Sequence, residues 1–400
     1  MIAKFTPCDL CGTVEAPPSK SMAHRFLIGA ALSRQKCTLT GVDYSEDILA
    51  SIDCLKALGA HITTENDTVT VDPKGFMQVK NPTLHCRESG STLRFFIPLC
   101  LCLGTKATLY GSERLLQRPL DVYEAICNFN GFEFNKEKDC VTLCGDLKSA
   151  DYKVRGDISS QFITGLISAL VYLGKESSIE IIPPFESRSY IDLTISALNS
   201  FGASVEFVSE YKISIKPSDM HAFCGKIEGD YSNAAFLDAF NHIGSSVNVQ
   251  NLNPSSLQGD KVYKNYFESI SSGTPTLDIS DCPDLGPILF ALAALKNGAM
   301  FTGTDRLKAK ESDRGQAMHE ELKKLGGGLV FGDNTITVPK QELKYSGQML
   351  DSHNDHRIVM AMSVILSKIG GEINGAQAIK KSYPGFFDDI KRLGAKVELI

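Results

Sequence analysis

The 400-residue chain is too long for one compact core, because single cores usually stop growing near about 250–300 residues. Its content of 43% hydrophobic and 22% charged residues is typical of globular proteins and excludes a disordered or fibrous chain. The 47 acidic residues outnumber the 41 basic ones, and this net charge of −6 argues against a general nucleic-acid-binding protein.

Other global features favour a cytoplasmic protein. The first ten residues, MIAKFTPCDL, lack the apolar core of a secretory signal. No apolar run approaches the roughly 20 residues that a membrane helix needs. The 12 cysteines are scattered and mostly lie within apolar runs, which is typical of reduced, buried thiols. The pair Cys8 and Cys11 has no second pair of ligands nearby, so we expect no metal site there.

An internal repeat runs through the chain, in which a helix-like segment ends at glycine and two short strands follow. The glycines recur about every 70 residues, with one gap of nearly two periods; they are Gly59, Gly131, Gly202, Gly326 and Gly394. Gly273 lies within the gap and supplies a sixth, degraded copy. Each glycine is expected where a helix ends in a left-handed turn. Three units can share buried helices, so six units predict two similar α/β domains.

Several helices are expected inside these domains because they are apolar on nearly all sides. They span residues 162–173, 285–295 and 358–369. Two more helices, which follow Ser19-Lys20-Ser21 and Ser89-Gly90-Ser91-Thr92, begin in the same way. All five begin with polar residues. A helix N-terminus offers free N–H groups and a partial positive charge, so several converging starts would form an anion site.

In chain order, the first candidate site comprises Lys20, Ser21 and Arg25. Helical spacing would bring Lys20 and Arg25 to one side, where they could bind an anionic substrate. The alternative is a capped helix with solvated charges, and the segment alone does not decide between them.

The next two candidates each have a simple structural explanation. Gly90 would let backbone N–H groups approach a phosphate closely, but it also fits an ordinary N-cap, and the chain contains no GxxxxGK[ST] motif. Arg118 precedes a proline that is typical of a first helical turn, so it could be a surface residue.

Ser159, Ser160 and Gln161 open a hydrophobic helix. A cap needs only one hydroxyl, so the additional hydroxyl and the amide favour phosphate binding.

The segment from residue 308 to 314 carries five charged residues in seven. Such runs are usually solvated, but Lys310, Glu311 and Arg314 fall within one helical turn and could face one ligand. Arg314 could grip a carboxylate with two hydrogen bonds, and Glu311 could transfer a proton.

His356 and Arg357 lead directly into a buried helix, which is costly unless they have an anionic partner. Metal binding by His353 and His356 lacks a third ligand, so we expect none. Lys381 has no interpretation from its own segment.

Taken together and in this order, these segments resemble the enolpyruvyl transferases, and best the branch that uses shikimate 3-phosphate. The resemblance covers nearly the whole chain and implies a two-domain inverse α/β barrel, in which each domain holds three βαβαββ units around buried helices. It implies an N-terminal domain of residues 18–227 and a C-terminal domain of residues 1–17 and 228–400, with the active site in the cleft between them. Ala23 departs from the family pattern, which has serine there.

The resemblance also implies a role for each candidate. Lys20, Ser21 and Arg25 would contact both substrates. Phosphoenolpyruvate would be bound by Lys20, Gly90, Arg118, Gln161, Lys310, Arg314, Arg357 and Lys381. Shikimate 3-phosphate would be bound by Ser21, Arg25, Ser159, Ser160, Gln161, Ser187, Tyr190, Asp284 and Lys310. Asp284 would be the base that removes the proton of the 5-hydroxyl, and Glu311 or Lys20 would protonate the methylene carbon of phosphoenolpyruvate.

The implied reaction passes through a tetrahedral adduct that expels phosphate, and it requires no metal or cofactor. The protein is expected to be a cytoplasmic monomer of aromatic amino acid biosynthesis, with no nucleic-acid or membrane partner. Three alternatives remain open: a transferase acting on UDP-N-acetylglucosamine, an RNA 3′-phosphate cyclase-like ligase, and a catalytically inactive anion-binding scaffold. The first usually has Lys-Asn where this chain has Lys20-Ser21, and the second would need ATP.

Overall fold

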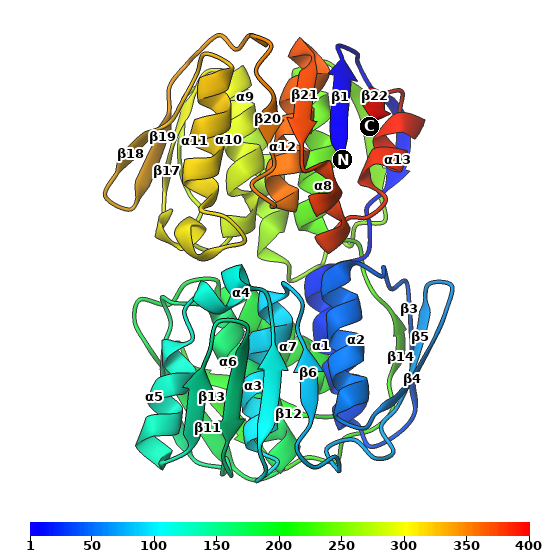
Figure 1. Cartoon of the computed structure of the whole chain (residues 1–400), viewed down its shortest axis with the longest axis vertical. Helices are drawn as coiled ribbons and strands as arrows, with labels where there is room; N and C mark the ends of the chain where they lie inside the picture. Colours follow the sequence, from blue (N-terminus) through cyan, green and yellow to red (C-terminus); the bar gives the residue numbers. More distant parts are fainter. The chain divides into compact units, whose positions relative to one another are not determined.

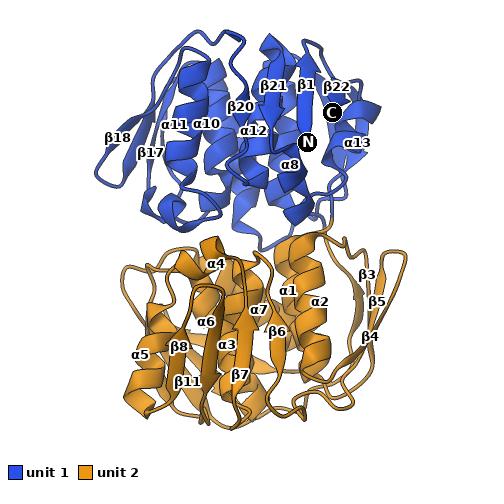
Figure 2. Ribbon diagram, viewed as in Figure 1, with its two compact units in different colours: residues 1–17, 229–400 blue, residues 18–228 orange.

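The computed structural model describes residues 1–400 and divides into two compact units. Figure 2 shows unit 1, formed by Met1–Pro17 and Gly229–Ile400, and unit 2, formed by Pro18–Glu228. Each unit has its own hydrophobic core. None of the helices combines the length and the apolar character needed to cross a bilayer.

Unit 2 consists of helices and three four-stranded sheets (Figure 1). Its helices are α1 (Lys20–Leu32), α2 (Glu46–Ala57), α3 (Gly90–Leu101), α4 (Glu113–Gln117), α5 (Asp121–Asn130), α6 (Ser160–Leu173) and α7 (Arg188–Ser200). Its strands are β3 (Cys37–Thr40), β4 (His61–Glu65), β5 (Thr68–Asp72), β6 (Thr83–His85), β7 (Ala107–Tyr110), β8 (Glu133–Lys136), β9 (Cys140–Cys144), β10 (Asp151–Arg155), β11 (Ser177–Ile182), β12 (Ser204–Ser209), β13 (Lys212–Lys216) and β14 (Cys224–Lys226).

The three sheets of unit 2 share one strand pattern. Their orders are β14-β3-β5-β4, β6-β7-β9-β8 and β10-β11-β13-β12, and in each the first pair is parallel and the other two are antiparallel. Alternation sets which face is buried: in β13 the side chains of Ile213 and Ile215 are buried, and Lys212 and Lys216 are exposed. The hairpins that follow Gly59, Gly131 and Gly202 are therefore three copies of one unit.

Unit 1 repeats this plan less regularly. Its strands are β1 (Ile2–Thr6), β2 (Cys11–Glu15), β15 (Ser246–Gln250), β16 (Thr276–Asp278), β17 (Ala299–Thr302), β18 (Val330–Gly332), β19 (Thr335–Val338), β20 (Leu350–Asp351), β21 (Gly371–Asn374) and β22 (Lys396–Leu399). Its α-helices are α8 (Tyr231–Asp238), α9 (Tyr263–Ser272), α10 (Gly286–Leu295), α11 (Arg314–Lys324), α12 (His356–Ile369) and α13 (Phe386–Arg392). Short 3-10 turns are η1 (Ala239–Ile243), η2 (Gly259–Val262), η3 (Pro283–Leu285), η4 (Asp305–Ala309) and η5 (Ala376–Lys381).

The sheet β20-β21-β1-β22 joins the two ends of the chain. Strand β1 lies between β21 and β22 and is antiparallel to both (Figure 1). The repeat that follows Gly394 thus takes one of its two hairpin strands from the first residues of the chain.

The sixth copy, at Gly273, does not have the predicted form. A single short strand, β16, follows this glycine, and it pairs in parallel with β17 of the next sheet. The remaining sheet of unit 1 has only two strands, β15 and β2. The segment after β16, Ser-Asp-Cys-Pro-Asp, has no second alternating run, so it turns into η3 instead of returning as a hairpin strand.

The backbone angles of the repeat glycines also separate Gly273 from the other five. The φ angles of Gly59, Gly131, Gly202, Gly326 and Gly394 lie between 69° and 101°, the left-handed region in which glycine is favoured. Gly273 has φ −174°, an extended backbone open to any residue. The three helices predicted to be interior, α6, α10 and α12, are buried along nearly their whole length, so this part of the prediction is confirmed. Helices α1 and α3, which also begin with polar residues, are buried to a similar extent.

Candidate functional site

In unit 1, three predicted cations converge on the Asp284 carboxylate. Oδ1 accepts hydrogen bonds from Lys310 Nζ at 3.0 Å and Arg314 Nη1 at 2.8 Å, and Oδ2 accepts one from Arg357 Nη2 at 3.0 Å. Asp284 lies in η3, directly before the buried helix α10. The starts of helices α10, α11 and α12 therefore supply side chains to one place.

Arg314 connects this carboxylate to two others. It is 1% exposed, and its Nε donates to Asp355 Oδ2 at 2.9 Å while its Nη2 donates to Glu311 Oε2 at 2.7 Å. Asp355 is fully buried and is the N-cap of α12, where Oδ1 accepts the backbone N–H of Arg357 at 2.9 Å. Together with Ser312, whose hydroxyl donates to Asp355 at 3.1 Å, these groups form the ionic cluster of unit 1. Its members are Asp284, Lys310, Glu311, Ser312, Arg314, Asp355 and Arg357.

Burial and charge shift the pKa values of this cluster in opposite directions. Burial is the largest influence on Lys310 and lowers its pKa to about 8, against the opposing effect of Asp284. Burial alone would raise the pKa of Asp284, but Arg357, Lys310 and Arg314 together hold it well below its usual value. Burial would lower the pKa of Arg314, and its three carboxylate partners raise it instead. In this state Asp284 is an ion-paired carboxylate and a weak base.

Two further contacts surround the start of α12. Arg357 Nη1 donates to Ser232 Oγ at 2.6 Å, and its guanidinium lies 5.9 Å from the centre of the Phe236 ring. Lys381 Nζ donates to the backbone oxygen of Asn354 at 2.6 Å. Lys381, which had no interpretation from its own segment, is thus next to the residue that precedes the N-cap.

In unit 2, Arg25 is a buried cation among neutral partners. It is 4% exposed, and its Nε donates to Thr194 Oγ1 at 2.8 Å, Nη2 to the Tyr190 carbonyl at 2.9 Å and Nη1 to the Ser21 carbonyl at 2.6 Å. Burial lowers its pKa to about 10. A buried guanidinium without a carboxylate partner favours an incoming anion.

A second group in unit 2 joins the starts of α3 and α6. Arg94 Nη1 donates to Gln161 Oε1 at 2.7 Å, and Gln161 Nε2 donates to Ser91 Oγ at 3.0 Å. Arg94 Nη2 also donates to the carbonyl of Pro119, the residue after Arg118, at 3.0 Å. The Arg118 guanidinium lies directly against Gly90: a Cβ at position 90 would be 2.6 Å from Nη1.

The remaining predicted residues occupy separate positions on the same helix starts. Lys20 forms an ion pair with Asp47 at 2.8 Å, which links α1 to α2. Ser159 caps α6 through Gln161 N at 3.3 Å, and Ser160 is the buried first residue of that helix. Ser187 is buried, precedes α7 and has φ 56°.

Sequence reasoning missed several members of these groups. Ser232 follows Asp230, the N-cap of α8, which resembles the other polar helix starts and precedes an apolar Ala-Ala-Phe-Leu run. The same pattern that identified the other buried helices could have found it. No local pattern indicates the contacts of Arg94, Asp47 and Asp355, because their partners Gln161, Lys20 and Arg314 lie 67, 27 and 41 positions away in the sequence.

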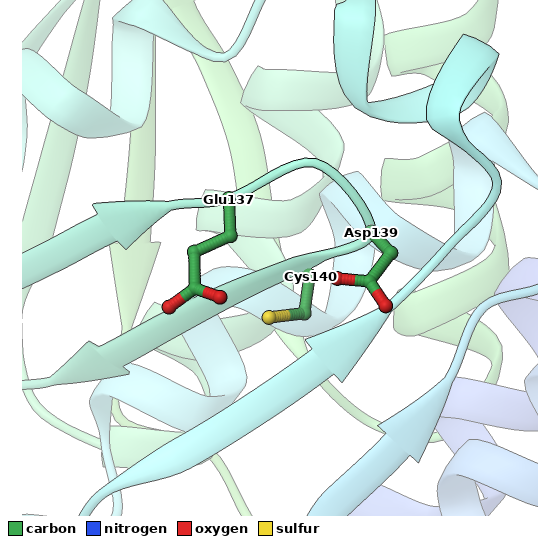
Figure 3. Close-up of side chains that lie close together, drawn as sticks. All are labelled: Glu137, Asp139 and Cys140. Carbon is green, nitrogen blue, oxygen red and sulfur yellow. The ribbon is translucent and has the colours of Figure 1, made fainter.

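Two groups of possible metal-ligating side chains have ligand atoms within 4.8 Å of one another. Figure 3 shows Glu137, Asp139 and Cys140, which lie at the β8–β9 turn, with both carboxylates on exposed residues. In the other group, Glu320, Glu321 and His353, the Glu321 carboxylate is paired with Lys324 Nζ at 2.8 Å. Neither group includes a member of the ionic cluster.

Known proteins are similar to this chain over nearly its whole length. Residues 6–390 match the model of a family described as EPSP synthase (3-phosphoshikimate 1-carboxyvinyltransferase). The chain is 40% identical over 417 residues to a 3-phosphoshikimate 1-carboxyvinyltransferase of Clostridium kluyveri, covering 98% of this chain and 97% of the relative. It is 38% identical over 421 residues to the protein of that name in Clostridium perfringens, with coverage of 98% and 97%.

The fold is similar to that of solved structures. One is an EPSP synthase from Acinetobacter baumannii at 2.37 Å resolution, with a TM-score of 0.79, 22% sequence identity and 99% of each chain covered. This likeness supports the predicted two-domain fold and, at this identity, the fold alone.

Proposed function

The chain belongs to the EPSP synthase (3-phosphoshikimate 1-carboxyvinyltransferase) family, and we propose that it performs the reaction of that family with the residue groups described above. It is a transferase of the shikimate pathway that moves the enolpyruvyl group of phosphoenolpyruvate to shikimate 3-phosphate. The observation that carries this function is the match over residues 6–390. The ionic cluster supports the residue assignments.

We propose that the cations of the ionic cluster bind phosphoenolpyruvate. Arg314 and Arg357 can each offer planar pairs of N–H donors to a carboxylate or phosphate, and Lys310 adds a point charge. Lys381, which binds the Asn354 carbonyl just before α12, adds a second point charge. In the structure their charges are partly balanced by Asp284, Glu311 and Asp355, so an anionic substrate has to compete with these carboxylates.

This competition suggests how Asp284 becomes a base. Three cations hold its pKa down, with burial acting in the opposite direction. Substrate anions that draw these cations away would leave the burial effect and raise the pKa. Asp284 would then accept the proton of the 5-hydroxyl as that oxygen attacks carbon 2 of phosphoenolpyruvate.

The second proton goes to the methylene carbon. We propose Glu311 or Lys20 as its donor. When the adduct collapses, the same group takes a proton back from this carbon. Collapse breaks the bond from carbon 2 to the phosphate oxygen, releases phosphate and restores the double bond of the enolpyruvyl group. Glu311 is held by Arg314 at 2.7 Å, and Lys20 by Asp47 at 2.8 Å, so both are oriented by a partner.

Unit 2 supplies the proposed residues for shikimate 3-phosphate. The Arg25 guanidinium has only neutral partners, which supports binding of an anion there. Ser21, Ser159, Ser160, Gln161, Ser187 and Tyr190 complete the proposed set, with Asp284 and Lys310 of unit 1. Gly90 and Arg118 are proposed on the phosphoenolpyruvate side, because Gly90 leaves room for the Arg118 guanidinium.

We also propose that the protein acts in the cytoplasm as a monomer. All 12 cysteines are free thiols, which is usual in a reducing compartment. Gel filtration with light scattering is expected to give a mass near 43.6 kDa.

The function is tested by measuring phosphate release from phosphoenolpyruvate. Release is expected with shikimate 3-phosphate and not with UDP-N-acetylglucosamine, and it should not require ATP. Release with the sugar nucleotide alone would contradict the proposal.

A further inference from the structure

Helix α11 contacts residues 351–355, the segment directly before α12, at two points. Arg314, its first residue, binds the Asp355 carboxylate at 2.9 Å, and Glu321, seven residues further on, binds the segment near its other end. Seven residues are close to two helical turns, so Arg314 and Glu321 lie on one face of α11. The first contact belongs to the ionic cluster, and the second has no role in the function proposed so far.

Glu321 is a buried carboxylate whose oxygens are both fully used. Oε1 accepts from His353 Nε2 at 2.7 Å and from Lys324 Nζ at 2.9 Å. Oε2 accepts from Lys324 Nζ at 2.8 Å and from the backbone N–H of Asp351 at 2.8 Å. Glu321 is fully buried, so the loss of one partner would leave a buried polar atom unsatisfied.

The segment Asp351–Asp355 has an unusual backbone. His353 and Asn354 have φ angles of 49° and 53°, a left-handed conformation that is uncommon outside glycine and that asparagine and histidine adopt more readily than most residues. The N–H groups of His353, Asn354 and Asp355 are all bound within the segment, by Asp351 Oδ1, Ser352 Oγ and the Ser352 carbonyl. The other two N–H groups of the segment bind acceptors outside it: that of Ser352 binds the Asn374 carbonyl, and that of Asp351 binds Glu321.

His353 strengthens the link to Glu321. The hydrogen bond that His353 donates to Glu321 is the main cause that raises the pKa of His353, against burial and with help from the charges of Glu321, Asp351 and Glu320. The raised pKa favours the imidazolium form, and in that form the hydrogen bond to the buried carboxylate is charge-assisted.

We propose that Glu321 and His353 are positioning residues for phosphoenolpyruvate binding: they fix the left-handed turn at residues 353–354, which directs the Asn354 carbonyl to Lys381 and sets Asp355 and Arg357 at the ionic cluster. Neither residue touches the cluster itself. The inference rests on the proposed function only in naming the substrate.

The kinetic test compares the KM values for the two substrates in Glu321→Gln and His353→Ala. The KM for phosphoenolpyruvate is expected to rise at least fivefold, because Arg357 and Lys381 shift, while the KM for shikimate 3-phosphate stays within twofold. His353→Gln keeps an N–H donor and should restore much of the loss. Glu320→Gln is the matched control, since this exposed neighbour lies 3.8 Å from His353 Nε2 and should change neither KM.

Hydrogen exchange of the peptide that covers residues 349–357 tests the link without substrates. Exchange is expected to accelerate at least fivefold in Glu321→Gln and His353→Ala but not in Glu320→Gln. Unchanged exchange, or equal increases in both KM values, would overturn the proposal, and so would faster exchange with unchanged KM values. If Glu321→Gln does not fold, His353→Ala carries the test, because its side chain is 25% exposed. Failure of the wild-type chain to release phosphate would contradict the proposed function, while the exchange result would still support or overturn the positioning link.

Discussion

Gly90 and Arg118 are packed so closely that only a residue without a side chain leaves the guanidinium in place. A Cβ at position 90 would lie 2.6 Å from Nη1 and 2.8 Å from the central carbon of Arg118. Both distances are well below ordinary contact, so the guanidinium of Arg118, which is 7% exposed, would have to move.

Gly90→Ala is therefore expected to displace Arg118 and weaken phosphoenolpyruvate binding. The KM for phosphoenolpyruvate should rise about tenfold, equivalent to about 1.4 kcal/mol, with little change in the KM for shikimate 3-phosphate. Steady-state kinetics check this. Gly273→Ala is the matched control, because nothing lies within 4 Å of a Cβ there and its backbone is extended. An unchanged KM in Gly90→Ala would contradict the role of Arg118.

Arg314→Met should destabilise unit 1. The substitution removes the cation that pairs with the fully buried Asp355 and leaves that carboxylate buried and uncompensated. Breaking a buried pair in this way costs about 3 kcal/mol, which denaturant unfolding followed by circular dichroism would measure. Lys308→Met removes an exposed pair with Asp305 and should cost less than about 0.5 kcal/mol. Equal losses in both variants would argue against a structural role of the cluster.

Asp284→Asn and Glu311→Gln should each reduce kcat at least tenfold, or about 1.4 kcal/mol in activation free energy. Asparagine cannot accept the hydroxyl proton, and glutamine cannot donate a proton to carbon. Asp281→Asn serves as the control, since Asp281 is an exposed carboxylate three residues from Asp284. Full turnover by both active-site variants would show that the proton transfers use other groups.

The activity should depend on pH through Lys310. Its pKa lies near 8 because burial opposes the charged form, so the cation is present below pH 8 and is lost as the pH rises through that value. The kcat/KM for phosphoenolpyruvate should fall above pH 8, and Lys310→Arg should move this fall to higher pH. In Lys308→Arg the profile should not move, because the pKa of Lys308 is raised. A profile unaffected by Lys310→Arg would assign the titration to another group.

Arg25→Met should remove the stabilisation that shikimate 3-phosphate gives to the protein. Burial lowers the pKa of Arg25, so its charge works against folding until an anion binds. The melting temperature of the wild-type chain should rise when shikimate 3-phosphate is added, and that of Arg25→Met should not. Arg155→Met, which changes an exposed arginine paired with Asp157, should keep the ligand-dependent rise. A rise that persists in Arg25→Met would place the anion elsewhere.

The fold could be predicted from the sequence where local signals and tertiary structure agree. The left-handed glycines, such as Gly59 and Gly394, are visible because their backbone conformation selects the residue type. Gly273 misled the prediction because its surroundings in the sequence resemble a repeat, while its backbone is extended and needs no glycine. Spacing alone does not reveal whether a second strand follows.

The candidate site could be predicted only as separate helix starts. Lys310, Glu311 and Arg314 share one turn, so their proximity follows from helical geometry. The contacts of Arg314 with Asp284 and Asp355 join residues 30 and 41 positions apart, and no local pattern encodes them. Ser232 has a polar helix start that is visible in the sequence, but its contact with Arg357, 125 residues away, has no local signal either.

The placement of β1 between β21 and β22 constrains the order in which the chain can fold during synthesis. Unit 2 is continuous from Pro18 to Glu228, so all its strands are available once residue 228 has left the ribosome. Strand β1 precedes unit 2 in the chain, whereas its partners β21 and β22 follow it, and Ile2 and Ile400 exchange backbone hydrogen bonds at 2.8 and 2.9 Å. Strand β1 therefore waits unpaired until β21 and β22 have also been synthesised.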